Sequence, residues 1–381
     1  MTPPRVLVAP DKFKGSLPAA GVAAAVAYGL REHREDLDVA ECPVADGGEG
    51  TLDAAVAAGY HRVPVVATGP AGQPVDTAFA RLGTRAVVEL ADVSGLARLP
   101  GGRPAPLTAG STGTGEVIRH ALDAGCRDLV VGLGGSACTD GGSGLLRALG
   151  ARLVDSAGGE LPPGGAALAD LDRVDLAGLD PRLRDATLTV ASDVDNPLHG
   201  ADGAAAVYGP QKGATPWQVA LLDAALTRWA DRVTAALGTE GAHRPGAGAA
   251  GGAGYALLSV LGGHFRPGID TVLELVGFHT LVPGAALVVT GEGALDEQTL
   301  RGKGPAGVAR VARSHGVPVV AVAGRSDLSR ESLAAAGILG VYTLTDLEPD
   351  LAVCIAEPVP LLRRIGAAIG ADRLSGVRPP G

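Results

Sequence analysis

Residues 127–150 read RDLVVGLGGSACTDGGSGLLRALG, and this stretch decides the fold that we expect. It begins with an apolar run at 127–133, which is typical of a buried strand. A loop with many glycines (132–144) follows at once, and the segment 144–150 then predicts a helix. A strand, a polar loop and a helix in this order form the repeating unit of a parallel α/β sheet.

The same alternation continues on both sides of this stretch. Strands are expected at 5–10, 37–44, 186–192, 286–291, 317–324 and 340–344, and helices at 18–33, 51–59, 111–125, 215–237 and 307–316. At 381 residues the chain is long enough for two domains. We therefore predict two α/β domains with mainly parallel sheets, Rossmann-like or flavodoxin-like.

Two segments rich in glycine and proline, 67–77 and 279–286, are candidate crossings between the domains. They predict a discontinuous domain of residues 1–70 plus 285–381, with residues 71–284 inserted into it. A plain division near residue 150 is the alternative that stays open.

Composition narrows the class of partner. The net charge is −9 and no run of Lys or Arg occurs, which argues against a nucleic-acid partner. The N-terminus does not have the pattern of a signal peptide, and the longest apolar runs are far too short to span a membrane. The four cysteines show no CxxC spacing, so we expect free thiols and a cytoplasmic protein.

The glycine-rich polar loops carry the functional signal, because each one directly follows an apolar run. They lie at 9–17, 44–51, 132–144, 191–198, 290–299 and 323–327. In open α/β sheets, ligands bind outside the carboxyl ends of the strands. Glycine lets main-chain N–H groups approach an anion, and Lys12, Lys14 and Lys303 add charges that suit phosphate oxygens.

These loops also hold more carboxylates than an anion site needs, which indicates a hard cation, Mg²⁺, carrying the substrate's phosphates. The acids are Asp11, Asp46, Glu49, Asp140, Asp193, Glu292 and Asp296. Phosphoryl transfer requires this combination, and the loop at 132–144 is expected to lie against the phosphates of a nucleotide.

Named nucleotide motifs are absent or misplaced. No GxxxxGK[ST] occurs, because Gly302-Lys303 is followed by Gly304. A literal GxGxxG at 246–251 follows HRP instead of a strand, which is the wrong context for a dinucleotide fingerprint. No GxSxG is present, which weakens a serine-hydrolase interpretation.

Long ordered blocks, however, match a known family. The chain resembles the type-1 glycerate kinases, bacterial ATP-dependent kinases that act on D-glycerate. The resemblance covers almost the whole length through APDKFKGSL (9–17), ADGGEGT (45–51), STGTGE (111–116), GLGGSACTDGG (132–142), ASDVDNPLHGADGAAAVYGPQKGA (191–214), GAGAAGGAG (246–254) and VVTGEGALDEQTLRGKGPAGVA (288–309). Thr139 stands where relatives commonly have Asn, and Tyr208 replaces a usual Phe.

The resemblance implies a two-domain α/β fold with the active site in the interdomain cleft. It also implies ATP with Mg²⁺ as the donor and a 2- or 3-phosphoglycerate as the product, in the catabolism of glycerate and other organic acids. Carried over by position, catalytic roles fall on Asp193, Lys14 and Asp11, and cofactor binding falls on Gly134, Gly135, Thr112 and Thr114. Substrate or phosphate binding is implied for Asp46, Gly47, Gly48, Glu49, Ser136, Asp140, Asn196, Gln211, Lys212, Glu292, Asp296 and Lys303.

Two further assignments rest on chemistry. Asp193 and Asp296 are the candidate Mg²⁺ ligands, and Arg325 is the candidate cation for the carboxylate of glycerate. Each candidate also has a structural interpretation: Asp193 as an Asx turn, Asp46 and Glu49 as turn residues, Asp140 as a helix cap, and Lys14 or Arg325 as a surface charge. The Gly246–Gly254 stretch is either a flexible lid or a tight helix start.

Other functions stay open at this point. A two-domain protein that closes on an anionic ligand without chemistry would share these loops. An NAD(P)-dependent dehydrogenase is weaker because its fingerprint is misplaced. The expected ligand is a small molecule, the chain is expected to be a monomer or a homodimer, and the sequence does not decide which hydroxyl is phosphorylated.

Overall fold

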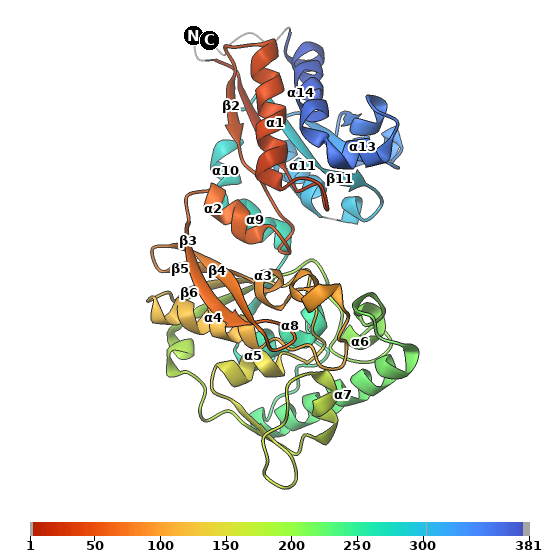
Figure 1. Ribbon diagram of the computed structural model, residues 1–381. Helices are drawn as coiled ribbons and strands as arrows, with labels where there is room; N and C mark the ends of the chain where they lie inside the picture. Colours follow the sequence, from red (N-terminus) through yellow and green to blue (C-terminus); the bar gives the residue numbers. More distant parts are fainter. Residues whose placement is uncertain (1–2, 302, 376–381) are drawn as a thin grey trace. The chain divides into compact units, whose positions relative to one another are not determined.

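The computed structural model describes residues 3–301 and 303–375, and the chain divides into two compact units. The first unit comprises the described parts of Met1–Asp46, Asp53–Gly59 and Ile269–Gly381, and the second comprises Gly47–Leu52 and Tyr60–Gly268 (Figure 1). Each unit has its own sheet, so each is described by itself.

The first unit is built on a five-stranded sheet in the order β13-β12-β11-β1-β2, in which every pairing is parallel. Its strands are β1 (Arg5–Pro10), β2 (Asp38–Glu41), β11 (Leu287–Leu295), β12 (Val319–Ser326) and β13 (Val341–Thr343). Its helices are α9 (Gly268–Leu275), α10 (Phe278–Leu281), α11 (Gly304–Ser314), α12 (Arg330–Ala335), α13 (Leu351–Ala356), α14 (Pro358–Leu374) and α1 (Ala19–His33). The short α2 (Thr51–Ala57) begins in the second unit and ends in the first.

Side chains of these strands alternate between two apolar cores. Val6 and Val8 of β1 belong to the core formed with α1 and α14, whereas Leu7 and Ala9 belong to the core formed with α9 and α11. A strand that is apolar on both faces reads as a continuous hydrophobic run, which is why RVLVAP could be recognised as a buried parallel strand.

The second unit holds a six-stranded mixed sheet in the order β10-β9-β6-β5-β4-β3. The strands are β3 (His61–Thr68), β4 (Pro74–Leu82), β5 (Arg85–Glu89), β6 (Asp128–Gly132), β9 (Thr187–Ala191) and β10 (His264–Arg266). Strands β3, β4 and β5 pair antiparallel, and β5, β6, β9 and β10 pair parallel. A separate antiparallel pair consists of β7 (Arg152–Val154) and β8 (Arg173–Asp175).

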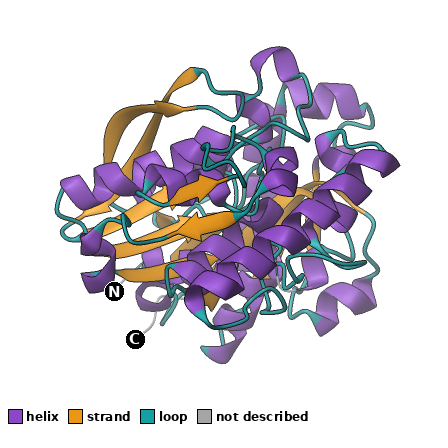
Figure 2. Cartoon of the chain, turned by 90° about the horizontal axis from the view of Figure 1, so that it is seen from below, coloured by secondary structure: helices purple, strands orange, loops and turns teal. Residues whose placement is uncertain are grey.

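Helices pack around this sheet, and Figure 2 marks the helices and strands of the whole chain by colour. They are α3 (Leu90–Ser94), α4 (Thr112–Asp123), α5 (Ser143–Ala148), α6 (Ala204–Tyr208), α7 (Pro216–Leu237) and α8 (Ala253–Tyr255). The longest, α7, starts at a capping box of Thr215 and Gln218 with Pro216 at its first position, and it ends at Gly238 with a φ of 74°. Its buried Trp229 lies in the core of the unit.

The predicted α/β class with mainly parallel sheets is confirmed. The expected helices and strands are present to within a few residues. Further elements were not expected, among them the β3–β4–β5 meander, the β7–β8 pair, β10, α9 and α14. Residues 67–77 include the turn of the β3–β4 hairpin, where Gly69 N–H donates to Gln73 O at 2.6 Å. Residues 60–70 therefore lie in the second unit and residues 269–284 in the first, unlike the expected boundaries.

Candidate active site

In the first unit, neighbouring parallel strands bring acidic residues to one edge of the sheet. Pro10 of β1 lies opposite Gly291 of β11, so Asp11 and Glu292 occupy the next position on two adjacent strands. Asp11 N–H donates to Gly291 O at 2.7 Å. Asp46 follows β2, the other neighbour of β1. We call Asp11, Asp46, Glu292 and Asp296 the acid cluster.

Two carboxyl groups of the acid cluster, those of Asp11 and Glu292, have raised pKa values. Burial raises the pKa of Asp11 to about 6, and the charge of Asp46 adds to this while Lys12 opposes it. Burial likewise raises the pKa of Glu292 to about 7, with further contributions from Asp11, Asp46 and Asp296, although Thr299 opposes the shift by donating its hydroxyl at 2.5 Å. Such carboxylates are stabilised by a bound cation.

Positive groups flank the acid cluster. Lys12 Nζ lies 3.6 Å from Asp11 Oδ1, and Lys303 is the N-cap residue of α11. Lys14 is exposed. Asp296 is exposed, and its Oδ1 accepts bonds from the N–H groups of Gln298 and Thr299. Asp296 therefore stabilises the turn at 296–299.

In the second unit, the glycine loop that follows β6 packs against protein backbone. A Cβ atom on Gly132 would lie 2.5 Å from Gly47 O, and one on Gly134 would lie 2.5 Å from Gly48 Cα. Glycine is needed at both positions because another glycine loop lies directly against them. The expected close neighbour was a nucleotide phosphate, and the neighbour that these contacts show is the loop at 47–48. Gly135, with a φ of 76°, is exposed.

Asp140 is fully buried, and its carboxylate accepts several hydrogen bonds that hold this loop. Its two carboxylate oxygens accept bonds from the N–H and hydroxyl of Ser111 and from the N–H groups of Gly142 and Gly144. The last two donors lie at the start of α5, so Asp140 takes the capping role that the sequence left as an alternative. No partner outside the protein is needed to satisfy this carboxylate.

Lys212 and Ser136 form the second polar contact of this region. Lys212 Nζ donates to Ser136 Oγ at 2.9 Å and to Cys138 O at 2.6 Å. Burial lowers the pKa of Lys212, against the opposing effects of Cys138 and Asp140. Thr114 is also internal, since its hydroxyl lies 2.9 Å from Ser94 Oγ, whereas Thr112 begins α4 and is half-buried.

The loop after β9 holds Asp193 and Asn196. Asp193 is exposed, and its Oδ1 accepts a bond from Gly268 N–H at 2.8 Å. Asn196 donates to Asp202 O at 2.9 Å and accepts the hydroxyl of Tyr208 at 2.6 Å. The replacement of a usual Phe by Tyr208 therefore adds a hydrogen bond that orients Asn196.

The remaining candidates lie on the surface. Glu49 and Gln211 are exposed, and Arg325 pairs with the exposed Asp327 at 3.0 Å. One residue that the sequence analysis missed is Glu89, which is buried at the end of β5 and accepts bonds from Gly50 N–H and Leu52 N–H. The sequence signal that could have identified Glu89 is its position as an acidic residue at the end of an apolar strand.

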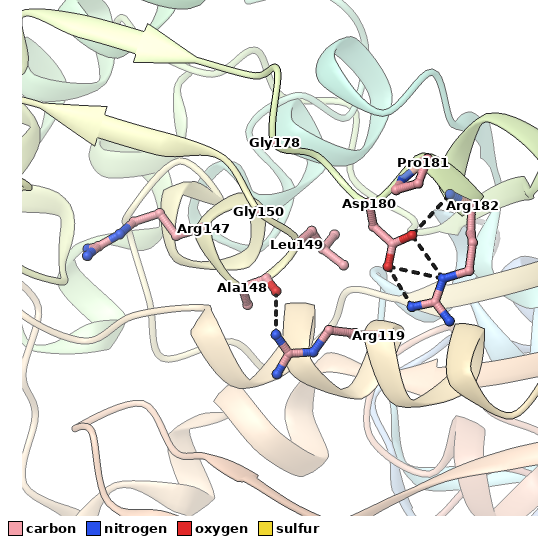
Figure 3. A pocket seen from close by; sticks show the side chains of 9 residues that line it. All are labelled: Arg119, Arg147, Ala148, Leu149, Gly150, Gly178, Asp180, Pro181 and Arg182. Carbon is pink, nitrogen blue, oxygen red and sulfur yellow. Dashed lines mark hydrogen bonds and ion pairs between the residues drawn. The ribbon is translucent and has the colours of Figure 1, made fainter.

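A hollow of about 480 Å³ in the second unit is lined by none of these residues. Figure 3 shows it between α4 and the segments around Gly150 and Gly178, with the Arg182 guanidinium turned to Asp180. Arg182 also pairs with Asp123 at 2.7 Å, so its charge is already compensated. We assign no catalytic role to this hollow.

The donor set fits Mg²⁺ held together with a substrate. Within residues 3–301 and 303–375, no three His, Cys, Asp or Glu side chains are arranged to hold a metal ion by themselves. Mg²⁺ commonly takes only one or two carboxylates and completes its shell with phosphates and water, and the acid cluster offers such carboxylates. In the same described part of the chain, every helix is too short or too polar to cross a membrane.

Comparisons with known proteins point to one family. A sequence model of the glycerate kinase family matches residues 6–373. The chain is 48% identical to the glycerate kinase of Bacillus subtilis, with 86% of both chains covered, and 43% identical to the glycerate 2-kinase of Escherichia coli, with 84% and 85% covered. A crystal structure assigned as glycerate kinase 2 from Salmonella typhimurium superposes with a TM-score of 0.84 at 42% identity, over 97% of this chain and 98% of that one.

Proposed function

Because the chain belongs to the glycerate kinase family and therefore phosphorylates glycerate, we propose that ATP is the phosphoryl donor, that Mg²⁺ accompanies it and that the product is 2-phosphoglycerate. The name of the Escherichia coli relative, glycerate 2-kinase, supports transfer to the 2-hydroxyl. 3-Phosphoglycerate is the alternative product.

The acid cluster is the observation that carries this proposal. Asp11 and Glu292 are poorly solvated carboxyl groups at the carboxyl ends of adjacent parallel strands. Lys12 and Lys303 lie in the same loops, and lysine suits phosphate oxygens. Mg²⁺, when bound, would neutralise charge on the transferring phosphoryl group.

Asp193 is our proposed general base for the acceptor hydroxyl, and with Asp296 it stays a candidate Mg²⁺ ligand. Its exposed position, and the bond from Gly268 N–H that orients one of its oxygens, support this role. Lys14 is proposed to contact phosphate and Arg325 the carboxylate of glycerate. Asp193→Asn is expected to lower kcat by roughly 10²–10⁴-fold, and an unchanged kcat would return Asp193 to the role of a turn residue.

The structure gives no support to the dehydrogenase alternative. In the GxGxxG match, a Cβ atom on Gly248 would lie 2.2 Å from Pro197 O and one on Gly251 would lie 2.0 Å from Cys138 O. These glycines accommodate protein backbone, and residues 246–254 form a buried, packed segment instead of an exposed lid.

The deciding experiment is a coupled assay of ADP release with D-glycerate, ATP and Mg²⁺, followed by phosphorus NMR of the product. We expect turnover that stops when EDTA removes divalent cations, and a 2-phosphoglycerate resonance. Turnover that survives EDTA would remove Mg²⁺ from the proposal, and a 3-phosphoglycerate resonance would reverse the regiochemistry. A cytoplasmic location and a monomer or homodimer belong to the same proposal, and light scattering after gel filtration tests the latter.

A further inference from the structure

Lys212 is unusual among the basic residues of this chain. Only four of the 32 Lys and Arg residues are lysine: Lys12, Lys14, Lys212 and Lys303. The chain thus uses arginine almost everywhere that a positive charge is needed. Lysine at position 212 therefore indicates a site at which the larger, planar guanidinium group of arginine could not replace the ammonium group.

Burial of the Lys212 ammonium group lowers the stability of the fold. Its side chain is only 2% exposed, and in the described part of the chain no carboxylate lies within ion-pairing distance of its ammonium group. Asp140 is nearby, but its oxygens are occupied by Ser111 and the start of α5. A buried ammonium without a paired carboxylate destabilises the fold, so a packing role alone does not explain it.

Hydrogen-bond counting shows what Lys212 does to Ser136. An ammonium group only donates, so Ser136 Oγ accepts the bond of 2.9 Å and must direct its own hydrogen elsewhere. Ser136 is 6% exposed, and among residues 3–301 and 303–375 no acceptor for that hydrogen is found. A nearly buried hydroxyl with an unused hydrogen is poised for an acceptor from outside the protein.

The backbone holds Ser136 in place. Residues 95 and 136 form an isolated antiparallel bridge, in which Leu96 N–H donates to Gly135 O and Ala137 N–H donates to Ser94 O. Lys212 itself is anchored by its second bond, to Cys138 O at 2.6 Å. The direction of the Ser136 hydroxyl is therefore set on both sides before any ligand arrives.

We propose that Lys212 is a positioning residue that does not touch the substrate: its ammonium group fixes Ser136 so that the serine hydroxyl donates to an anionic oxygen of a bound substrate. That oxygen belongs either to the carboxylate of glycerate or to a phosphate of the nucleotide. The inference rests on the proposed function and deepens it, since it separates the roles of two residues that the sequence treated alike.

The test is a double-mutant cycle on the full-length enzyme with Ser136→Ala, Lys212→Met and the double variant. Each single variant is expected to lower kcat/KM by roughly 10–100-fold, the range for a hydrogen bond to a charged group. The double variant should lose no more than about threefold beyond the worse single one, because both changes remove the same interaction. Both single variants should raise the KM of the same substrate, and whether this is glycerate or ATP identifies the oxygen.

Ser259→Ala is the matched control, since it removes another hydroxyl of the second unit, one that donates to Gly241 O. It should leave kcat and both KM values unchanged. Circular dichroism checks the fold of every variant, and if Lys212→Met does not fold, Lys212→Leu, which also lacks an N–H donor, takes its place.

Three results would overturn the inference: wild-type kcat/KM in Lys212→Met beside a loss in Ser136→Ala, losses that multiply in the double variant, or a loss of kcat with both KM values unchanged. Trapping of a phosphorylated Ser136 would also overturn it, because the serine would then be a nucleophile. If the wild-type enzyme shows no turnover, the proposed function fails, and calorimetric titration with glycerate and with Mg·ATP still tests the inference. If neither ligand binds, both the proposed function and the inference about Lys212 are wrong.

Discussion

Glu292 shows how one residue can serve a site at the expense of the fold. Its pKa is raised from 4.5 to about 7, chiefly by burial, so the folded chain binds this proton more tightly than the unfolded chain does. Between these two pH values the unfolded state loses a proton that the folded state keeps. The free energy of unfolding therefore falls as the pH rises from 4.5 to about 7 and has lost this contribution above that range.

We predict that Glu292→Gln is more stable than the wild type near pH 8, by roughly 1–3 kcal/mol. Glutamine keeps an oxygen that can accept the Thr299 hydroxyl and removes only the charge. Urea unfolding followed by circular dichroism at about pH 8 and pH 4.5 measures the difference, which should vanish at the lower pH. Glu297→Gln, at an exposed neighbour, is the control. A gain in stability that does not depend on pH would contradict the argument.

Asp140 presents the opposite case, a buried acid whose partners are all internal. Asp140→Asn replaces one accepting oxygen by an NH₂ group that faces the donors Ser111 and Gly144. We predict that it lowers the free energy of unfolding by about 3 kcal/mol or more, while the folded fraction keeps its KM for ATP and glycerate. Chemical denaturation and steady-state kinetics on the same sample separate these effects.

The control for Asp140→Asn is Asp155→Asn, which changes a half-buried acid that also accepts from two backbone N–H groups. It should cost less than about 1 kcal/mol. If Asp140→Asn instead raised KM without a change in stability, the phosphate-binding role expected from the sequence would stand.

At the scale of elements, the tightest helix pair of the first unit is α1 with α14. A Cβ atom on Gly29 would lie 1.9 Å from Arg363 O, and one on Gly366 would lie 2.3 Å from Val26 O. Glycine thus lets the two backbones approach closely. No candidate site residue lies in either helix, so stability and activity can be separated here.

We predict that Gly366→Ala lowers the free energy of unfolding by about 1–3 kcal/mol, despite the better helix propensity of alanine. Ala24→Leu, which adds more volume at an exposed position of α1, should be nearly neutral. Thermal unfolding compares the two variants, and kcat and KM should stay at wild-type values in both. An equal effect of the two substitutions would show that the close approach is not what matters.

Sequence reasoning found the elements of the parallel sheets because strands that are buried on both faces read as unbroken apolar runs. It missed β3 and β4, because the prolines Pro64, Pro70 and Pro74 are typical of a linker. Pro64 and Pro74 nevertheless lie in two strands that pair antiparallel. The strand-end rule correctly brought Asp11 and Glu292 to one sheet edge. It could not show that Gly132 and Gly134 accommodate Gly47 and Gly48, because contacts between distant segments follow from topology and not from local pattern.

On the scale of the whole molecule, each unit has a complete interior of its own. The core of the second unit contains only residues between Ala67 and Leu258, and both cores of the first unit draw only on residues of the first unit. The second unit is nearly continuous in sequence, whereas β1 and β11 of the first are neighbours that lie far apart along the chain. The two units should therefore differ in whether a single fragment can fold.

We predict that the fragment 47–268 folds by itself, since it contains all six strands of its sheet and the core around Trp229. The only two tryptophans of the chain, Trp217 and Trp229, lie in this fragment, and Trp229 is fully buried while Trp217 is 69% exposed. Urea unfolding followed by tryptophan fluorescence should show one cooperative transition with a blue-shifted native emission. The shorter fragment 60–268 should be less stable, because it loses the Gly50 and Leu52 N–H groups that satisfy the buried Glu89. A fragment 47–268 with solvent-exposed emission and no cooperative transition would mean that its core depends on the rest of the chain.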